Sequence, residues 1–265
     1  MATDIRIRAG VHNLTDQNVA DLRSAYGQIQ AFSDNRSFQY LAGLHGVPSW
    51  YCWHHQGNAH IAQQMELFLP WHRAYLYTFE MGLRDQVPGV TLPWWDWTLR
   101  SPQQNGLPTI FTSAKGADGK PNPLKQFKIN LPDTNPPLVH TTKRHPGAPD
   151  GLPSQSDVDD ALAKTDFNDF TDAVENLHDQ VHGWVSGDMG VIGTAAFDPI
   201  FWCHHAMIDR LWDLWQVKNG TGNITPALMD QVLTPFNFKV SDVLNVTDLG
   251  YDYAAGQVVV PVGDS

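Results

Sequence analysis

Apolar residues recur every three to four positions in much of the chain, which is the spacing of a helix that buries one face. Thr15 can cap the first such stretch, Pro70 suits the first helical position of the third, and Asp198 and Pro199 suit the start of the last. The pattern therefore predicts a mainly α-helical protein. The predicted helices lie within residues 15–32, 37–46, 70–86, 166–185 and 198–216.

Residues 101–155 break this pattern. They are rich in Pro, Gly, Asn and Asp and show no sustained period, and a loop of that length is uncommon unless it is functional or covers another part of the molecule. The stretch LPWWDW, residues 92–97, is typical of a buried extended turn, and the C-terminal fifth is typical of short strands or coil. We expect a single domain over residues 1–265 with a long loop at about 101–155.

Composition narrows the classes of partner. The chain has 28 acidic and 17 basic residues and a net charge of −11, which disfavours nucleic acid and anionic membrane surfaces because both need basic patches. No stretch approaches the ~20 apolar residues of a membrane-spanning helix. The N-terminal residues MATDIRIRAGVHNLTD lack the apolar region of a signal peptide, so we expect a cytoplasmic location.

The chain contains twelve histidines, and their positions suggest a metal site. His178 and His182 are four residues apart, so on a helix they lie one turn apart on one face. Apolar residues border that face, and two buried imidazoles there leave several ring nitrogens to satisfy. A lone inward histidine is more often a hydrogen-bonded core residue, but a metal shared by both rings satisfies their nitrogens together.

Other inward histidines strengthen this interpretation. His45 and His72 each lie on the apolar face of a predicted helix. His204 and His205 are adjacent in the last helix and point about 100° apart, so only one of them can join the pair at 178 and 182. Three imidazoles per ion leave an open coordination position, which is typical of catalytic sites. Imidazole ligands suit zinc, copper, iron or nickel, so a zinc hydrolase stays open as one alternative.

Two longer motifs resemble the copper signatures of the tyrosinase family, which includes catechol oxidases and molluscan haemocyanin units. They are FLPWHRAYLYTFE, residues 68–80, and DPIFWCHHAMIDRLW, residues 198–212. ENLHDQVHGWVSGDMG, residues 175–190, is similar to the intervening segment, and YDY, residues 251–253, to the motif that closes the central domain. The resemblance implies a four-helix bundle that holds two copper ions, in a short form without the family's C-terminal shielding domain.

The resemblance also implies a ligand set. The first copper takes His45, His72 and a histidine between them, which in a Cys-x-His unit is His54, with Cys52 bonded to it by a thioether. HQGNAHIAQQME, which follows this unit, lengthens the usual spacing, so His55 and His60 stay as rivals. The second copper takes three residues, with His204 as a neighbour: His178, His182 and His205.

The activity implied by the resemblance is oxidation of o-diphenols to o-quinones by O2, together with ortho-hydroxylation of monophenols. Glu175 resembles the family's glutamate that holds a water near copper, and Asp179 could accept a phenol proton; either could also be a solvated helix carboxylate. Reversible O2 binding, as in haemocyanin, is the alternative. The expected partners are small phenolic substrates and O2, with a caddie-type copper-loading protein and a homodimer as further candidates.

Overall fold

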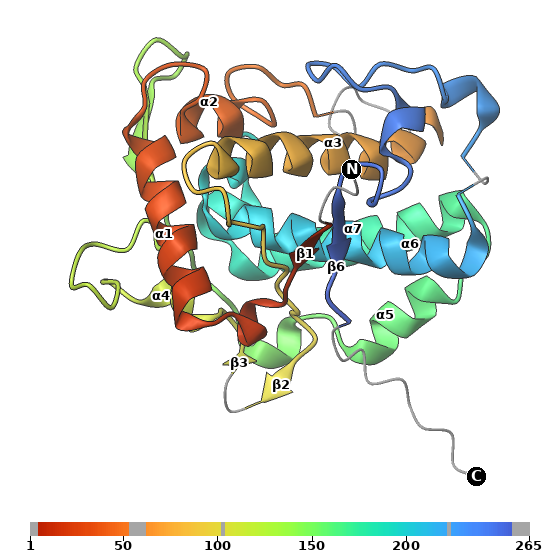
Figure 1. Cartoon of the computed structure of the whole chain (residues 1–265), viewed down its shortest axis with the longest axis horizontal. Coiled ribbons are helices and arrows are strands. Elements are labelled where there is room, and N and C mark those ends of the chain that lie inside the picture. Colours follow the sequence, from red (N-terminus) through yellow and green to blue (C-terminus); the bar gives the residue numbers. More distant parts are fainter. Residues whose placement is uncertain (1–4, 53–61, 102–103, 222–223, 256–265) are drawn as a thin grey trace.

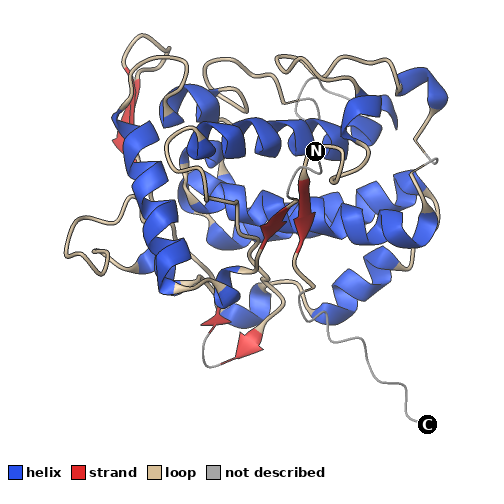
Figure 2. Ribbon diagram, in the orientation of Figure 1, coloured by secondary structure: helices blue, strands red, loops and turns tan. Residues whose placement is uncertain are grey.

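The computed structural model describes residues 5–52, 62–101, 104–221 and 224–255. Within them the protein is mainly helical, with few and short strands, as Figure 2 shows. This confirms the predicted fold class. The α-helices are α1 (Asp16–Ala31), α2 (Phe38–Gly43), α3 (Ala62–Arg84), α4 (Thr109–Thr112), α5 (Gln155–Leu162), α6 (Phe167–Val185) and α7 (Ile200–Asn219). The strands are β1 (Arg6–Arg8), β2 (Arg100–Ser101), β3 (Gln104–Asn105), β4 (Lys128–Leu131), β5 (Leu138–Thr141) and β6 (Tyr251–Tyr253).

Helices α3, α6 and α7 form the centre of the molecule. Each contacts the other two, and α1 packs against α3. Figure 1 shows the three central helices running roughly along the long axis of the molecule, with α1 steeply inclined to them at one end. The short helix α2 contacts α1 and the 3-10 helix η5 (Ala195–Phe197), which leads into α7. The central helices carry most of the histidines that the sequence singled out.

Polar side chains begin three of the long helices, and the sequence predicts two of them, Thr15 and Asp198. The Thr15 hydroxyl accepts the Asn18 N–H in a reciprocal capping box at α1. The Asp166 carboxylate caps α6, and Asp198 Oδ1 accepts the Ile200 N–H at 3.0 Å at the start of α7. Each cap satisfies N–H groups that have no partner within the helix.

Two local predictions are wrong. Pro70 lies inside α3, which begins at Ala62 rather than at the proline. The side chains of Leu67, Phe68 and Leu69 are buried, so packing of these residues outweighs the hydrogen bond that a proline loses in a helix. His45 lies two residues beyond the end of α2 rather than on that helix; the turn leading to Gly46 places it in the interior, where it is 1% exposed.

The interior is built largely from aromatic rings. Trp202 of α7 stacks on Phe79 of α3 with ring centroids 3.4 Å apart, and burial of such rings dominates the energy of a core. Trp94, Trp95 and Trp97 are fully buried, which confirms the predicted buried turn at 92–97.

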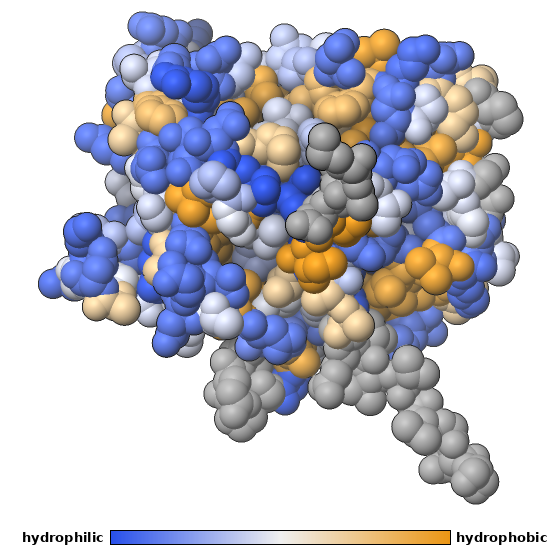
Figure 3. Space-filling model, in the orientation of Figure 1, coloured by the Kyte–Doolittle hydropathy of each residue, from blue (hydrophilic) through white to orange (hydrophobic). Residues whose placement is uncertain are grey.

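In Figure 3 one face of the molecule is mainly hydrophilic, with apolar side chains in small patches. No helix in the described residues is long and apolar enough to span a membrane.

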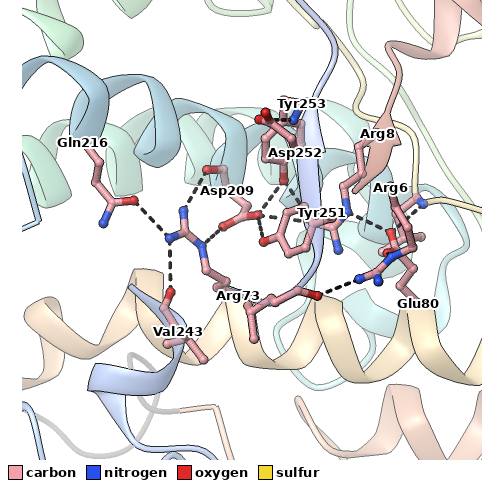
Figure 4. A network of polar contacts seen from close by, with 12 residues as sticks. Arg6, Arg8, Arg73, Glu80, Asp209, Gln216, Val243, Tyr251, Asp252 and Tyr253 are labelled. Atoms are coloured by element: carbon pink, nitrogen blue, oxygen red, sulfur yellow. Dashed lines mark hydrogen bonds and ion pairs between the residues drawn. The ribbon is translucent and has the colours of Figure 1, made fainter. Parts of the chain in front are cut away.

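A buried ionic network ties the two ends of the described chain to α3 and α7 (Figure 4). Strands β1 and β6 pair in parallel, and Arg8 of β1 contacts Asp209 of α7 at 3.2 Å. The same carboxylate accepts Arg73 Nε at 2.5 Å and the hydroxyls of Tyr251 and Tyr253. Burial alone raises the pKa of Asp209, but the two guanidinium groups hold it below its ordinary value.

The segment predicted as a long loop is partly ordered. Within residues 101–155, β4 and β5 pair as an antiparallel hairpin, and α4 is a single turn of helix. Its amides and charged side chains contact α6 and the start of α7. The segment is therefore packed on the bundle near the histidines.

Candidate metal centre

Three histidines from α6 and α7 converge on one point. His205 Nε2 lies 3.3 Å from His178 Nε2 and 3.2 Å from His182 Nε2. Metal–imidazole bonds of about 2.0–2.1 Å at tetrahedral angles place two ligand nitrogens about 3.3 Å apart. The three rings therefore already have the mutual spacing that a shared ion requires. We call His178, His182 and His205 the second histidine group.

In two of the three imidazoles, the other ring nitrogen fixes which side of the ring faces this point. His182 Nδ1 donates to the Met189 carbonyl at 2.7 Å, and His178 Nδ1 lies 2.9 Å from Asp179 Oδ1. A neutral imidazole that donates from Nδ1 keeps a lone pair on Nε2. Burial lowers the pKa of both His182 and His205, which favours the neutral form that binds metals.

Hydrogen bonds alone cannot satisfy the three Nε2 atoms that converge here. With the Nε2 atoms of His178 and His182 as acceptors, His205 Nε2 has at most one proton to donate to the two of them. A cation at the shared point accepts all three lone pairs at once. The residues present therefore fit a metal ion, and their imidazole chemistry suits copper among others.

The first histidine group contains His45, Cys52 and His72, whose ligand atoms lie within 4.8 Å of one another. All three residues are buried. His72 Nδ1 donates to the Phe68 carbonyl at 2.8 Å, and its Nε2 lies 3.6 Å from Cys52 Sγ. The predicted ligand His54 and its rivals, His55 and His60, lie outside the described residues, so the thioether stays a prediction.

The two groups lie against each other. The His72 and His205 rings stack with centroids 4.6 Å apart and planes 20° apart, and the His45 centroid is 6.2 Å from that of His205. Five of the six histidines predicted as ligands are thus brought together. This arrangement suits a binuclear centre at the meeting point of α3, α6 and α7.

His204 lies beside the second group. Its ring is parallel to that of His178 with centroids 5.3 Å apart, and it belongs to a cluster with His178, His182 and His205 whose ligand atoms lie within 4.8 Å. Burial, followed by the neighbouring imidazoles, lowers its pKa well below the ordinary value. The close Nε2 contacts to His178 and His182 are made by His205, however, as expected from the sequence.

Two carboxylates of α6 lie near this group. Glu175, one turn before His178, is buried; burial, followed by the charges of Asp179 and Asp172, raises its pKa to about 7. The Asp179 side chain is 67% exposed, and its Oδ1 contacts the Nδ1 of His178. Asp179 therefore orients a member of the group, a role that the sequence analysis did not assign to it.

An apolar rim joins the loops that leave the two groups. Trp50, Val191 and Ile192 are 45%, 55% and 46% exposed. The Trp50 ring lies against Gly193, since a Cβ at Gly193 would come within 3.2 Å of it, and the Val47 N–H donates to the Gly193 carbonyl at 3.1 Å. No pattern in the sequence indicates this rim, because its residues come together only through tertiary contacts.

Comparisons with known proteins agree with this geometry. The family model of the common central domain of tyrosinase matches residues 35–218. A G-type haemocyanin of Enteroctopus dofleini is 29% identical over 285 residues, which cover 94% of this chain and 9% of that protein. A tyrosinase of Streptomyces lincolnensis is 32% identical over 201 residues, which cover 64% and 72%. The structure of a tyrosinase from Burkholderia thailandensis has a TM-score of 0.79 at 24% identity, over 96% of this chain and 75% of that one.

These relatives are of two kinds, haemocyanins and tyrosinases. The chain spans only 9% and 8% of the first two haemocyanins that it matches, and most of the length of the Streptomyces tyrosinase. The fold of the Burkholderia tyrosinase supports the predicted helical architecture. Both tyrosinases and haemocyanins are therefore similar to this chain.

Proposed function

The chain belongs to the tyrosinase family, and from that premise we propose that it is a copper-dependent oxidase of phenols. It converts o-diphenols to o-quinones with O2 and hydroxylates monophenols at the ortho position. The observation that carries this proposal is the convergence of three Nε2 atoms at 3.2–3.3 Å in the second histidine group, with the first group stacked directly against it.

Each histidine group holds one copper ion in this proposal. The second ion is bound by His178, His182 and His205, and the first by His45, His72 and the histidine of the Cys52 segment. When bound, the copper ions supply the binding and reduction of O2. The remaining tasks of holding the phenol, accepting its proton and limiting access fall to other side chains.

Two carboxylates can handle protons. In the metal-free protein the pKa of Glu175 is raised to about 7, so this carboxylate can both accept and return a proton near neutral pH. Asp179 holds His178 through one oxygen and has a side chain that is 67% exposed, so a phenol that arrives from solvent can reach this carboxylate and pass its proton to it. Glu175 can therefore handle protons in the interior, and Asp179 can do so at the surface.

The apolar rim provides a docking surface for an aromatic ring. Trp50, Val191 and Ile192 expose apolar side chains on the loops that follow His45 and His182, and aromatic rings pack favourably on such surfaces. We therefore expect Trp50→Ala to raise KM for catechol by roughly tenfold, the equivalent of ~1.4 kcal/mol, with little change in kcat. Steady-state kinetics at saturating O2 measure both constants.

Reversible O2 binding is the second candidate, because the matched relatives include haemocyanins. The deciding experiment loads the purified protein with copper, confirms two ions per chain, and follows O2 uptake with catechol and then with phenol. Uptake with both substrates supports the full proposal, and uptake with catechol alone restricts it to diphenol oxidation. Absorbance changes on adding and removing O2, with no O2 consumed in the presence of either substrate, would indicate an O2 carrier instead of an oxidase.

A caddie-type copper-loading protein, a homodimer and a cytoplasmic location belong to the same proposal. The first is tested by comparing copper uptake by the isolated chain from a Cu(I) chelate with uptake inside its host. Analytical ultracentrifugation tests the second, and fractionation of the host cells tests the third. A protein that loads fully from the chelate at the host rate needs no delivery partner.

A further inference from the structure

A segment of the long loop runs along the end of α6 and closes it. The last turn of a helix leaves carbonyl groups without partners in the helix. Here the His145 N–H donates to the Val185 carbonyl and the Gly147 N–H donates to the Trp184 carbonyl, both at 2.9 Å. Trp184 Nε1 in turn donates to the Ala148 carbonyl at 2.6 Å. We call residues 140–148 the brace.

The brace is joined to the next turn of the chain through Asp188. This carboxylate is 8% exposed and accepts His140 Nε2 at 2.6 Å and the Lys143 N–H at 2.8 Å. In the opposite direction, the Asp188 N–H donates to the Lys143 carbonyl at 2.9 Å. Asp188 is thus held on its backbone and on its side chain by the same short segment.

The turn that carries Asp188 is under constraint. Ser186 has a φ of +56° and Gly187 a φ of +60°, a region that a residue with a side chain enters at a cost of order 1–3 kcal/mol. A Cβ at Gly187 would lie 2.0 Å from the Lys143 carbonyl oxygen, so only glycine lets the brace approach this closely. Contacts outside the turn therefore hold this conformation in place.

This turn positions His182. Asp188 lies in the 3-10 helix η4 (Gly187–Gly190), and the next residue, Met189, supplies the carbonyl that accepts His182 Nδ1 at 2.7 Å. The Asp188 carbonyl also accepts the Val191 N–H and the Thr194 hydroxyl at 3.1 Å. Moving Asp188 therefore moves the group that fixes the tautomer and the angle of the His182 ring.

The brace reaches the other helix of the second group as well. Arg144 Nε contacts both oxygens of Asp198, at 2.9 and 2.8 Å. Asp198 caps α7, and His205 follows in the second turn of that helix. One short segment therefore contacts the supports of His182 and of His205.

We propose that the brace is a positioning element of the second histidine group and acts chiefly through Asp188. It sets the direction in which His182 Nε2 points and thereby the affinity of this group for copper. The contacts of the brace given above lead to Asp188, to the end of α6 and to the cap of α7. This inference rests on the proposed copper site and adds to it a residue that does not touch the metal.

The test measures Cu(I) affinity of each group separately, by competition with a chromogenic chelator. A His72→Ala background reports on the second group, and a His178→Ala background on the first. We expect Asp188→Ala to lower the affinity of the second group by about 10–100-fold, as loss of an outer hydrogen-bond partner typically does, and to leave the first unchanged. Lys143→Ala is the matched control, since its side chain is exposed and the contacts use only its backbone.

Two more variants separate positioning from folding. Asp188→Asn keeps an oxygen that can accept the Lys143 N–H, so it should restore most of the affinity. His140→Ala removes only the partly exposed partner of Asp188 and should give a smaller loss of copper affinity. It serves as the test if Asp188→Ala does not fold. In the metal-free protein, NMR should show the Nδ1 proton of His182 exchanging slowly in the wild type and faster in Asp188→Ala.

Wild-type affinity of the second group in folded Asp188→Ala and His140→Ala would overturn the proposal. Equal losses in both groups would overturn it too, because they indicate general loosening of the fold. A wild-type protein that binds no copper removes the proposed function instead. In that case the exchange rate of the His182 proton still decides whether Asp188 positions this ring.

Discussion

The two histidine groups are built in different ways. The second group takes all of its members from two long helices, and a neighbouring carbonyl or carboxylate orients two of its three rings. The first group combines His45 from a turn, Cys52 from a segment without regular secondary structure and His72 from α3. A ligand set on helices is fixed by helical geometry, whereas a set on turns depends on contacts made elsewhere in the chain.

This difference explains which parts of the chain orient the rings of each group. Ring angles in the second group depend on the end of α6 and the start of α7, and the brace holds both of these ends. In the first group the Nδ1 of His72 is satisfied within its own helix, by the carbonyl of Phe68 four residues earlier. Substitutions outside the bundle should therefore affect the second group more than the first.

The largest expected effect comes from removing a member of the second group. His205→Ala should lose the second copper and lower catechol oxidation by at least ~10³-fold, because a bound metal contributes several kcal/mol to such chemistry. His204→Ala is the matched control on the adjacent residue: it should lose stability through the cavity that it leaves, yet keep both copper ions. Metal analysis together with O2 uptake measures both. Retention of copper by His205→Ala and its loss from His204→Ala would reverse the assignment.

A second change should affect both groups alike. Asp209 lies four residues after His205 and pairs with Arg73, the neighbour of His72. Asp209→Ala leaves two buried guanidinium groups without this partner, and breaking a buried pair typically costs about 3–5 kcal/mol. Urea denaturation of the metal-free protein measures this loss. The exposed pair of Asp34 and Arg36 offers the control, since Asp34→Ala should leave the free energy of unfolding almost unchanged.

This pair of variants also tests the contrast with the brace. Asp209→Ala should weaken copper binding by both groups, whereas Asp188→Ala should weaken binding by the second alone. An unchanged free energy of unfolding in Asp209→Ala would show that the network in Figure 4 is not what joins α3 to α7. Selective loss of one group in Asp209→Ala would show that the network serves only the helix that carries that group.

The sequence predicts the second group better than the first for a physical reason. A spacing of four residues places His178 and His182 on one helical face whatever else the chain does. His45 was expected on a helix and lies in a turn, because the apolar period of residues 37–46 does not reveal that α2 ends at Gly43. Pro70 misled in a similar way, since packing of the residues before it extends α3 to Ala62.

Other features had no local signal at all. The carbonyls of Met189 and Phe68 orient two ligands, and every residue has a carbonyl, so composition and spacing cannot single them out. The pairing of Asp188 with His140 joins residues 48 positions apart. Such contacts depend on the path of the long segment, which the sequence predicted only as an irregular covering loop.

A smaller effect is expected in the first group. Cys52 Sγ lies 3.6 Å from His72 Nε2, and the family resemblance predicts a thioether to His54, with His55 and His60 as rivals. After copper loading in air, peptide mass mapping should find Cys52 joined to one of these histidines, with the loss of two hydrogen atoms. Cys52→Ala should lower kcat by roughly tenfold, as changes next to a metal ligand commonly do.

Cys203 is the control for this prediction. It is buried, and burial raises the pKa of its thiol, so it should stay a free thiol and Cys203→Ala should leave the mass of the Cys52 peptide unchanged. Recovery of the unmodified Cys52 peptide from fully active protein would remove the thioether from the first group. The identity of the third ligand of the first group would then have to come from metal binding by His54→Ala, His55→Ala and His60→Ala.

The smallest expected effect concerns Glu175, which belongs to the second group's helix but is not one of its ligands. Its pKa is raised from 4.5 to about 7 by burial, followed by Asp179 and Asp172. The folded state therefore binds its proton more tightly than the unfolded chain does. The contribution of Glu175 to the free energy of unfolding is therefore full below pH about 4.5 and is lost as the pH rises through about 7. Glu175→Gln carries no such charge, so in metal-free protein its stability relative to wild type should rise across this window, by about 1–3 kcal/mol at pH 8.

Denaturant unfolding of both proteins between pH 4 and pH 8 measures this difference. Copper at the second group should shrink it, because a nearby cation stabilises the carboxylate and lowers its pKa. Asp172→Asn, on the exposed side of α6, removes one of the charges that raise this pKa, so it should narrow the difference slightly. A constant difference between Glu175→Gln and wild type over the whole range would mean that Glu175 has the same pKa in the folded and the unfolded chain, near its ordinary value. It would then be too acidic to return a proton at neutral pH, and proton handling would fall to Asp179.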